Sequence, residues 1–171
     1  NQAFNALRQP YTFYPTFFGT GIGSDATRFP AQDAVVLGNH NDATGPNNAN
    51  YTVAIGYYSG QLNQGTGSVA IGQQAGYNNQ GNNSVAIGYQ ASFSSSSGLG
   101  SYNIDVGYQA GYNSGSSGTN MINIGTESGY INNLTNSISI GVRAGYSSQG
   151  FNCTALGFQS GYSSQGDLPT W

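Results

Sequence analysis

One short strand-like motif, repeated in register along most of the chain, constrains the fold more than any other feature. The segment 52–56 reads Thr-Val-Ala-Ile-Gly, and Ser-Val-Ala-Ile-Gly recurs at 68–72 and at 84–88. Related copies stand at 103–107, 121–125, 137–141 and 153–157, and a degenerate copy stands at 34–38. From Gly56 onward the closing glycines are spaced by 16, 16, 19, 18, 16 and 16 residues. A fixed period of this kind is typical of solenoids, in which each unit packs only against its neighbours.

A base period of ~16 residues predicts an all-β parallel solenoid of about seven coils. Such a coil is too short for a strand plus a helix but suits two short strands and two turns, stacked about 4.8 Å apart. In Val69-Ala70-Ile71, Val and Ile point to one face of the strand and Ala to the other. We predict that the Val/Ile face is the core. The small residue between them then faces solvent or closely contacts another chain.

The repeat defines several sets of equivalent positions. The predicted core-strand residues are Val53, Ile55, Val69, Ile71, Val85, Ile87, Ile104, Val106, Ile122, Ile124, Ile138, Ile140 and Leu156. Glycines that permit the positive φ of a tight corner are Gly56, Gly72, Gly88, Gly107, Gly125, Gly141 and Gly157. A Gln-Gly turn closes several coils, at Gln64, Gln80, Gln149 and Gln165.

An aromatic residue recurs at one further position of the repeat, after an Ala-Gly or similar pair. These residues are Tyr77, Phe93, Tyr112, Tyr130, Tyr146 and Tyr162. We expect them to stack into a ladder that stabilises the roll or a chain interface. A functional alternative is a row of platforms for sugar rings.

The composition excludes several classes of function. Charged residues make up 5% of the chain, against about 25% in ordinary domains, and the three basic residues are all arginines. Nucleic-acid binding needs clustered Lys and Arg, so we expect no nucleic-acid partner. No run of about 18 apolar residues occurs, so we expect no membrane span. Low charge suits a stack, because like charges on neighbouring coils repel.

The two ends of the chain depart from the repeat. Residues 1–33 are rich in aromatic residues and proline and are predicted to form an N-terminal cap or anchor. Residues 34–166 are the predicted solenoid, and 167–171 a C-terminal tail or second cap. The chain begins with Asn1, so we expect a processed product or a fragment. Uncapped ends expose strand edges, which favours end-to-end pairing into a filament.

Reactive side chains are sparse and scattered. Asp105 lies inside a strand motif and Glu127 follows a corner, so these two acids are not expected to form an acid–base pair. His40 is the only histidine, and Cys153 fills a slot held by Ser in other repeats, with an intermolecular disulfide as the alternative. We therefore expect no enzyme, no catalytic or metal site and no cofactor.

Four Asn-x-Ser/Thr sequons lie ahead of strand motifs and are candidate glycosylation sites. They begin at Asn50, Asn82, Asn133 and Asn152. Their number is about what chance predicts for a chain so rich in Asn, Ser and Thr, so they do not establish glycosylation.

The Ser-Val-Ala-Ile-Gly motif, followed by Ala-Gly and a turn, resembles the head repeats of trimeric autotransporter adhesins. Similar repeats occur in structural proteins of large DNA viruses and in phage tail fibres. The resemblance covers about 52–166. It implies a left-handed parallel β-roll in a side-by-side homotrimer, displayed on a cell or virion surface. The small slot of each strand would then lie at the trimer axis.

The sequence thus predicts a structural, and in the adhesin case adhesive, surface fibre: an extracellular appendage or a virion fibre. Its expected partners are further copies of itself, with a host surface glycan or matrix as a further partner. An ice-binding or glycan-binding solenoid is the alternative, although ice binding needs a flat, regular face of Thr or similar residues on successive coils. Hexapeptide acyltransferases are a weaker rival, because their coils are longer and their catalysis uses a His that the repeats lack.

Overall fold

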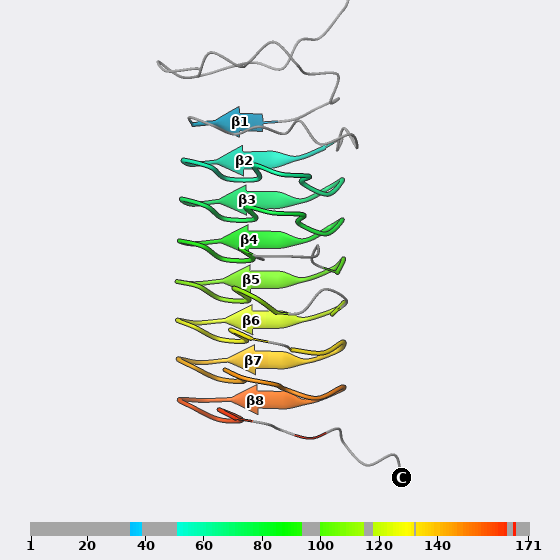
Figure 1. The fold of residues 1–171 in the computed structure, drawn as a ribbon, viewed down its shortest axis with the longest axis vertical. Helices are drawn as coiled ribbons and strands as arrows, with labels where there is room; N and C mark the ends of the chain where they lie inside the picture. The colour runs from blue at the N-terminus through cyan, green and yellow to red at the C-terminus, as the bar shows by residue number, and fades with distance from the viewer. Residues whose placement is uncertain are drawn as a thin grey trace, which may run out of the picture.

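The computed structural model describes residues 35–38, 51–93, 100–114, 118–131, 133–163 and 166, and it confirms the all-β parallel solenoid. Its strands are β1 (Val35–Leu37), β2 (Val53–Ile55), β3 (Val69–Ile71), β4 (Val85–Ile87), β5 (Ile104–Val106), β6 (Ile122–Ile124), β7 (Ile138–Ile140) and β8 (Thr154–Leu156). They form one parallel sheet in chain order, stacked as rungs in Figure 1. At the usual rung spacing, the seven steps between eight strands span about 34 Å.

Equivalent residues of successive coils pair directly. Ala70 lies opposite Ala86, and Ala86 lies opposite Asp105, although the second step is three residues longer than the first. The insertions therefore leave the register of the sheet unchanged. Single parallel bridges, such as Ile131 with Ser147, connect the coils a second time, beyond the turn that follows each strand.

The predicted orientation of the strand side chains is wrong. In β2 to β8 the middle residues are the buried ones: Ala54, Ala70, Ala86, Asp105, Asn123, Ser139 and Ala155 are each 0–2% exposed. The flanking residues point outward and are partly or largely exposed: Val53, Ile55, Val69, Ile71, Val85, Ile87, Ile104, Val106, Ile122, Ile124, Ile138, Ile140 and Leu156. The small slot therefore lines the interior of the coil and is not free to lie at a trimer axis.

The narrowness of the coil explains this reversal. A Cβ placed on Gly76 would lie 3.2 Å from the Cβ of Ala70, and one on Gly60 would lie 3.4 Å from that of Ala54. The facing wall is built from equally small residues, including the fully buried Ala75. Along β2 to β8 an interior this thin holds Ala, Ser, Asn or Asp, whereas Val or Ile would overpack it.

Glutamines complete the interior, whereas the Gln-Gly pattern predicts only a turn at these positions. The Nε2 of Gln80 donates to the backbone carbonyl of Val69 at 2.9 Å, and Gln149 reaches the carbonyl of Ile138 in the same way. In the latter coil the hydroxyl of Ser139 also donates to Oε1 of Gln149, at 2.5 Å. The corresponding Oε1 of Gln80 is buried without a hydrogen-bond partner among the described residues. The signal that could have shown this role is the constant spacing of 11 residues between Gln and its strand.

The corner glycines adopt backbone conformations that other residues rarely reach. Their φ values lie between +110° (Gly157) and +140° (Gly107). Gly72 has φ +126°, and a Cβ added there would lie 2.6 Å from the carbonyl oxygen of Gly88 in the next coil. Glycine is therefore required both by the conformation and by the close approach of the neighbouring backbone.

Candidate functional site: an apolar sheet face and an aromatic column

The outer face of the sheet is an apolar stripe, which we call the sheet face. It consists of the first and last residue of each strand, and Thr154 is the only one of these that is not Val, Ile or Leu. Ile87, Ile104 and Ile124 are 37–39% exposed, and Leu156 is 70% exposed. A continuous apolar surface along the full height of a protein marks an interaction site more often than a solvated face.

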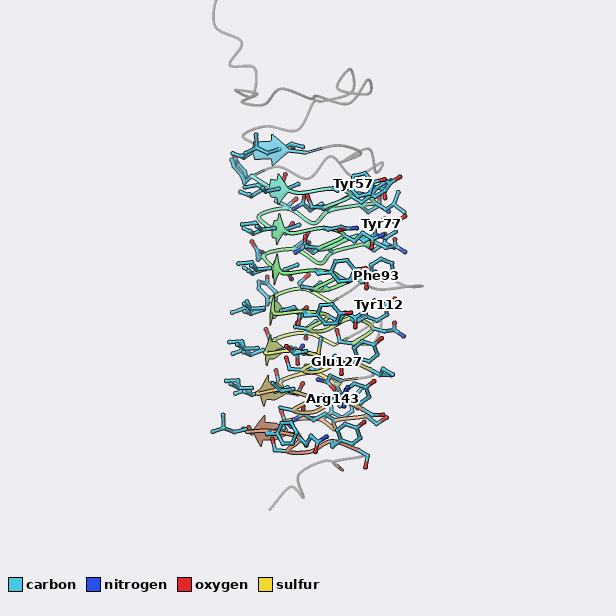
Figure 2. The ribbon with its side chains drawn as sticks, turned by 90° about the vertical axis from the view of Figure 1, so that its left-hand side faces the viewer. Tyr57, Tyr77, Phe93, Tyr112, Glu127 and Arg143 are labelled. Carbon is cyan, nitrogen blue, oxygen red and sulfur yellow. The ribbon has the colours of Figure 1, made fainter. Side chains whose placement is uncertain are left out.

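A second surface, the aromatic column, consists of Tyr77, Phe93, Tyr112, Tyr130, Tyr146 and Tyr162. Successive ring centroids are 4.9–5.0 Å apart and successive ring planes are within 14° of parallel. Figure 2 shows the strands at the left of the solenoid and the labelled rings of this column on the other side. The column and the sheet face therefore lie on different sides of the molecule, and one can be covered while the other stays exposed.

The stacking limits what the aromatic column can bind. A sugar ring docks on the flat face of an aromatic ring, but each inner ring has both faces covered by its neighbours. Burial in the stack, with Tyr112, Tyr146 and Glu127 close by, raises the pKa of Tyr130. The column thus offers ring edges to the solvent, which does not support the alternative of a row of sugar platforms.

A row of polar side chains follows the corner glycines. The amide of Gln90 donates to Gln74, and that of Gln109 donates to Gln90, both at 2.8 Å. The row continues with an ion pair between neighbouring coils, in which Nε of Arg143 lies 2.6 Å from Oε2 of Glu127. Hydrogen bonding to Glu127 raises the pKa of Arg143. These contacts bind one coil to the next and leave Glu127 in an ion pair.

Asp105 is the one carboxyl group found in the interior of the described coils, and it is fully buried. The hydroxyl of Ser92 donates to its Oδ2, and the amide of Asn123 donates to its Oδ1 at 2.7 Å. Burial raises the pKa of this carboxyl to about 6, against the opposing effect of the two hydrogen bonds. Asp105 lies inside the coil and Glu127 outside it, so the structure does not bring these two acids together for catalysis.

Two further candidates take on structural roles. Cys153 is fully buried, with Sγ 3.1 Å from the carbonyl oxygen of Gly166, which argues against an intermolecular disulfide in the folded protein. Asn133 is also fully buried, and its Nδ2 donates to Asn123 and Ser139. Its prediction as a glycosylation site is wrong for the folded chain, because the nitrogen that a glycan would modify is inaccessible.

The remaining sequons and end segments divide between exposed and undescribed residues. Asn82 and Asn152 are exposed and stay candidates. Asn50, His40 and the proposed caps at 1–33 and 167–171 lie outside the described residues. Over the part of the chain that is described, no three His, Cys, Asp or Glu side chains gather as metal ligands. The same part contains no helix of the length and hydropathy needed to cross a membrane.

Comparison with family models, with curated proteins and with solved structures found no match for this chain. The two surfaces and the repeat itself are the features of the chain that bear on its function.

Proposed function

We propose that this protein is a structural element of an extracellular or virion-surface fibre, which acts by packing its solenoid side by side with further copies, as a homotrimer. The sheet face carries this proposal. It extends over all eight strands and consists of apolar side chains, with Thr154 as the single exception.

Another copy of the chain suits the sheet face better than other occupants. The stripe has no charged side chain with which to select a charged ligand. Every further copy of the chain presents the same stripe, with its strands in the same order. Two or three such stripes can therefore pack Val and Ile against Val and Ile along their length, which removes apolar surface from water at about 25 cal/mol per Å². The trimeric state itself follows from the resemblance of the repeat to adhesin heads.

The alternative solenoid functions have less support. An ice-binding surface needs a regular row of Thr, but the exposed strand positions are Val, Ile and Leu apart from Thr154. Adhesion to a host glycan or matrix is compatible with a fibre, but no surface described here selects a sugar.

Light scattering of the native protein, with negative-stain images of the same sample, tests the proposal. We expect a particle mass three times that of the chain. Ile87→Lys places a charge in the middle of the sheet face and should shift the mass to that of the monomer, because a desolvated charge is costly in an apolar interface. Ser147→Lys, in the row of single bridges beyond the aromatic column, is the matched control and should leave the mass unchanged.

Three outcomes would contradict the proposal. A monomeric wild-type protein would reject self-association through the sheet face. Long polymers that survive Ile87→Lys would point to end-to-end assembly instead. Loss of assembly in Ser147→Lys, with folding intact by circular dichroism, would locate the contact on the other side of the solenoid.

A further inference from the structure

The lower part of the aromatic column is an uninterrupted run of four tyrosines: Tyr112, Tyr130, Tyr146 and Tyr162. Within this run the ring centroids are 4.9–5.0 Å apart and the planes lie 3–9° from parallel. Phe93 separates the run from Tyr77, stacked at 4.9 Å on each side. Four phenols, one on each of four successive coils, are thus held in mutual contact.

We propose that this tyrosine run is a site of oxidative cross-linking, at which a peroxidase-type oxidant joins neighbouring coils through dityrosine. Each of two adjacent phenols loses one electron and one proton to give a tyrosyl radical. The two radicals form a carbon–carbon bond between ring positions next to the hydroxyls, and the two ring hydrogens return to the oxygens. Hydrogen peroxide accepts the two electrons and two protons and becomes two molecules of water.

The geometry favours this reaction in two ways. Tyr162, the last ring of the run, is 40% exposed and gives an oxidant access to the stack. The fixed contact between rings raises the effective concentration of one radical near the next far above that of separate molecules. Phe93 has no phenol to oxidise, so the run ends at Tyr112 and Tyr77 is left out.

The distribution of basic residues makes the cross-link easy to detect. Trypsin cleaves after Arg and Lys, and the only such residues are Arg8, Arg28 and Arg143. Cleavage after Arg143 separates Tyr130 from Tyr146, on fragments 29–143 and 144–171. The protein is oxidised in the folded state at low concentration with horseradish peroxidase and hydrogen peroxide, then denatured and digested. We expect the two fragments to remain joined, with the mass of two hydrogen atoms lost and the fluorescence of dityrosine.

Two variants and one condition test the role of stacking. Tyr146→Phe keeps a ring in the column, as Phe93 does naturally, and should lower the yield of joined fragments at least about tenfold. Tyr77→Phe, outside the run, should leave the yield unchanged. Oxidation of the unfolded chain in denaturant should lose the preference for the Tyr130–Tyr146 link.

The proposal is wrong if the fragments separate fully after oxidation of the folded protein. It is equally wrong if Tyr146→Phe joins the fragments in the same yield as the wild type, or if the unfolded chain gives the same link in the same yield. Cross-links that join only different molecules would also refute it. The proposal does not depend on the fibre function, because the test is made within one chain.

Discussion

Replacing Asp105 by Asn should stabilise the protein at neutral pH and leave it unchanged at low pH. Asp105 is fully buried, and the interactions that set its pKa are burial and hydrogen bonds from two neutral side chains, Ser92 and Asn123. Asn is nearly the same size and already fills the equivalent slot of the next coil, at Asn123. The Ser92 hydroxyl can accept a hydrogen bond as well as donate one, so the new amide keeps a partner.

The size of the effect follows from the pKa. Burial raises the pKa of Asp105 from 3.8 to about 6 in the folded protein, a difference of about 2. At 1.36 kcal/mol per pKa unit, ionisation of the buried carboxyl costs about 3 kcal/mol at pH 7. The folded state binds this proton more tightly than the unfolded chain does. The contribution of Asp105 to the free energy of unfolding is therefore fully present below about pH 4 and is lost as the pH rises through 6.

Chemical unfolding followed by circular dichroism, at fixed protein concentration and at several pH values from 4 to 7.5, measures this effect. The difference in the free energy of unfolding between Asp105→Asn and wild type should grow from near zero to about 3 kcal/mol across this range. Asn123→Asp, which adds a second acid to the interior, should show the opposite dependence. A difference that does not change with pH would refute the reasoning, because it would place the Asp105 carboxyl in solvent and the strand interior on the wrong face.

Three further predictions concern stability and use the same unfolding measurement. Gly72→Ala should cost about 3 kcal/mol or more, because it combines a strained positive φ with a contact against the Gly88 carbonyl; a cost below about 1 kcal/mol would mean that the coils are further apart. Ala70→Ser should stabilise by about 0.5–1.5 kcal/mol, since the new hydroxyl can donate to the buried Oε1 of Gln80; destabilisation would mean that this oxygen is already satisfied. Tyr130→Ala should lose two stacked pairs, about 1–3 kcal/mol beyond the loss of burial, whereas Tyr130→Phe should retain most of it. Equal losses in these two variants would contradict a role for stacking.

Much of the fold could be predicted from the sequence because a solenoid repeats its local interactions. The recurring Val-Ala-Ile-Gly motif predicts a strand and a corner, and the constant period predicts that equivalent residues of successive coils meet. The parallel register, the glycines with positive φ and the stacking of aromatic rings all follow from that one relation between sequence and space. For the same reason the two longer repeats could be interpreted as insertions that leave the sheet intact.

Which face of each strand points into the coil could not be predicted from the alternation of residues alone. A period of two separates Val69 and Ile71 from Ala70, but it does not say which face is inside. The usual rule that large apolar residues are buried gave the wrong answer here, because the walls of the coil are too close for Val or Ile. The Ala, Gly and Gln residues that form the facing wall recur at regular positions in the sequence, but the sequence does not give the distance between that wall and the strand.

The distance between the strand and the facing wall is a property of the folded coil. It also determines which candidate site residues are buried and which are exposed. The middle position of the strand, which was expected to face solvent or another chain, lies in the interior, so the Asp105 carboxyl is buried and its pKa rises. The same distance also buried Asn133 and turned the Val/Ile positions into an exposed apolar face. The sequence by itself determined which residues stack on one another along the solenoid. Only the tertiary structure decided which of these stacks face inward, because that depends on how closely two walls separated by a turn approach each other.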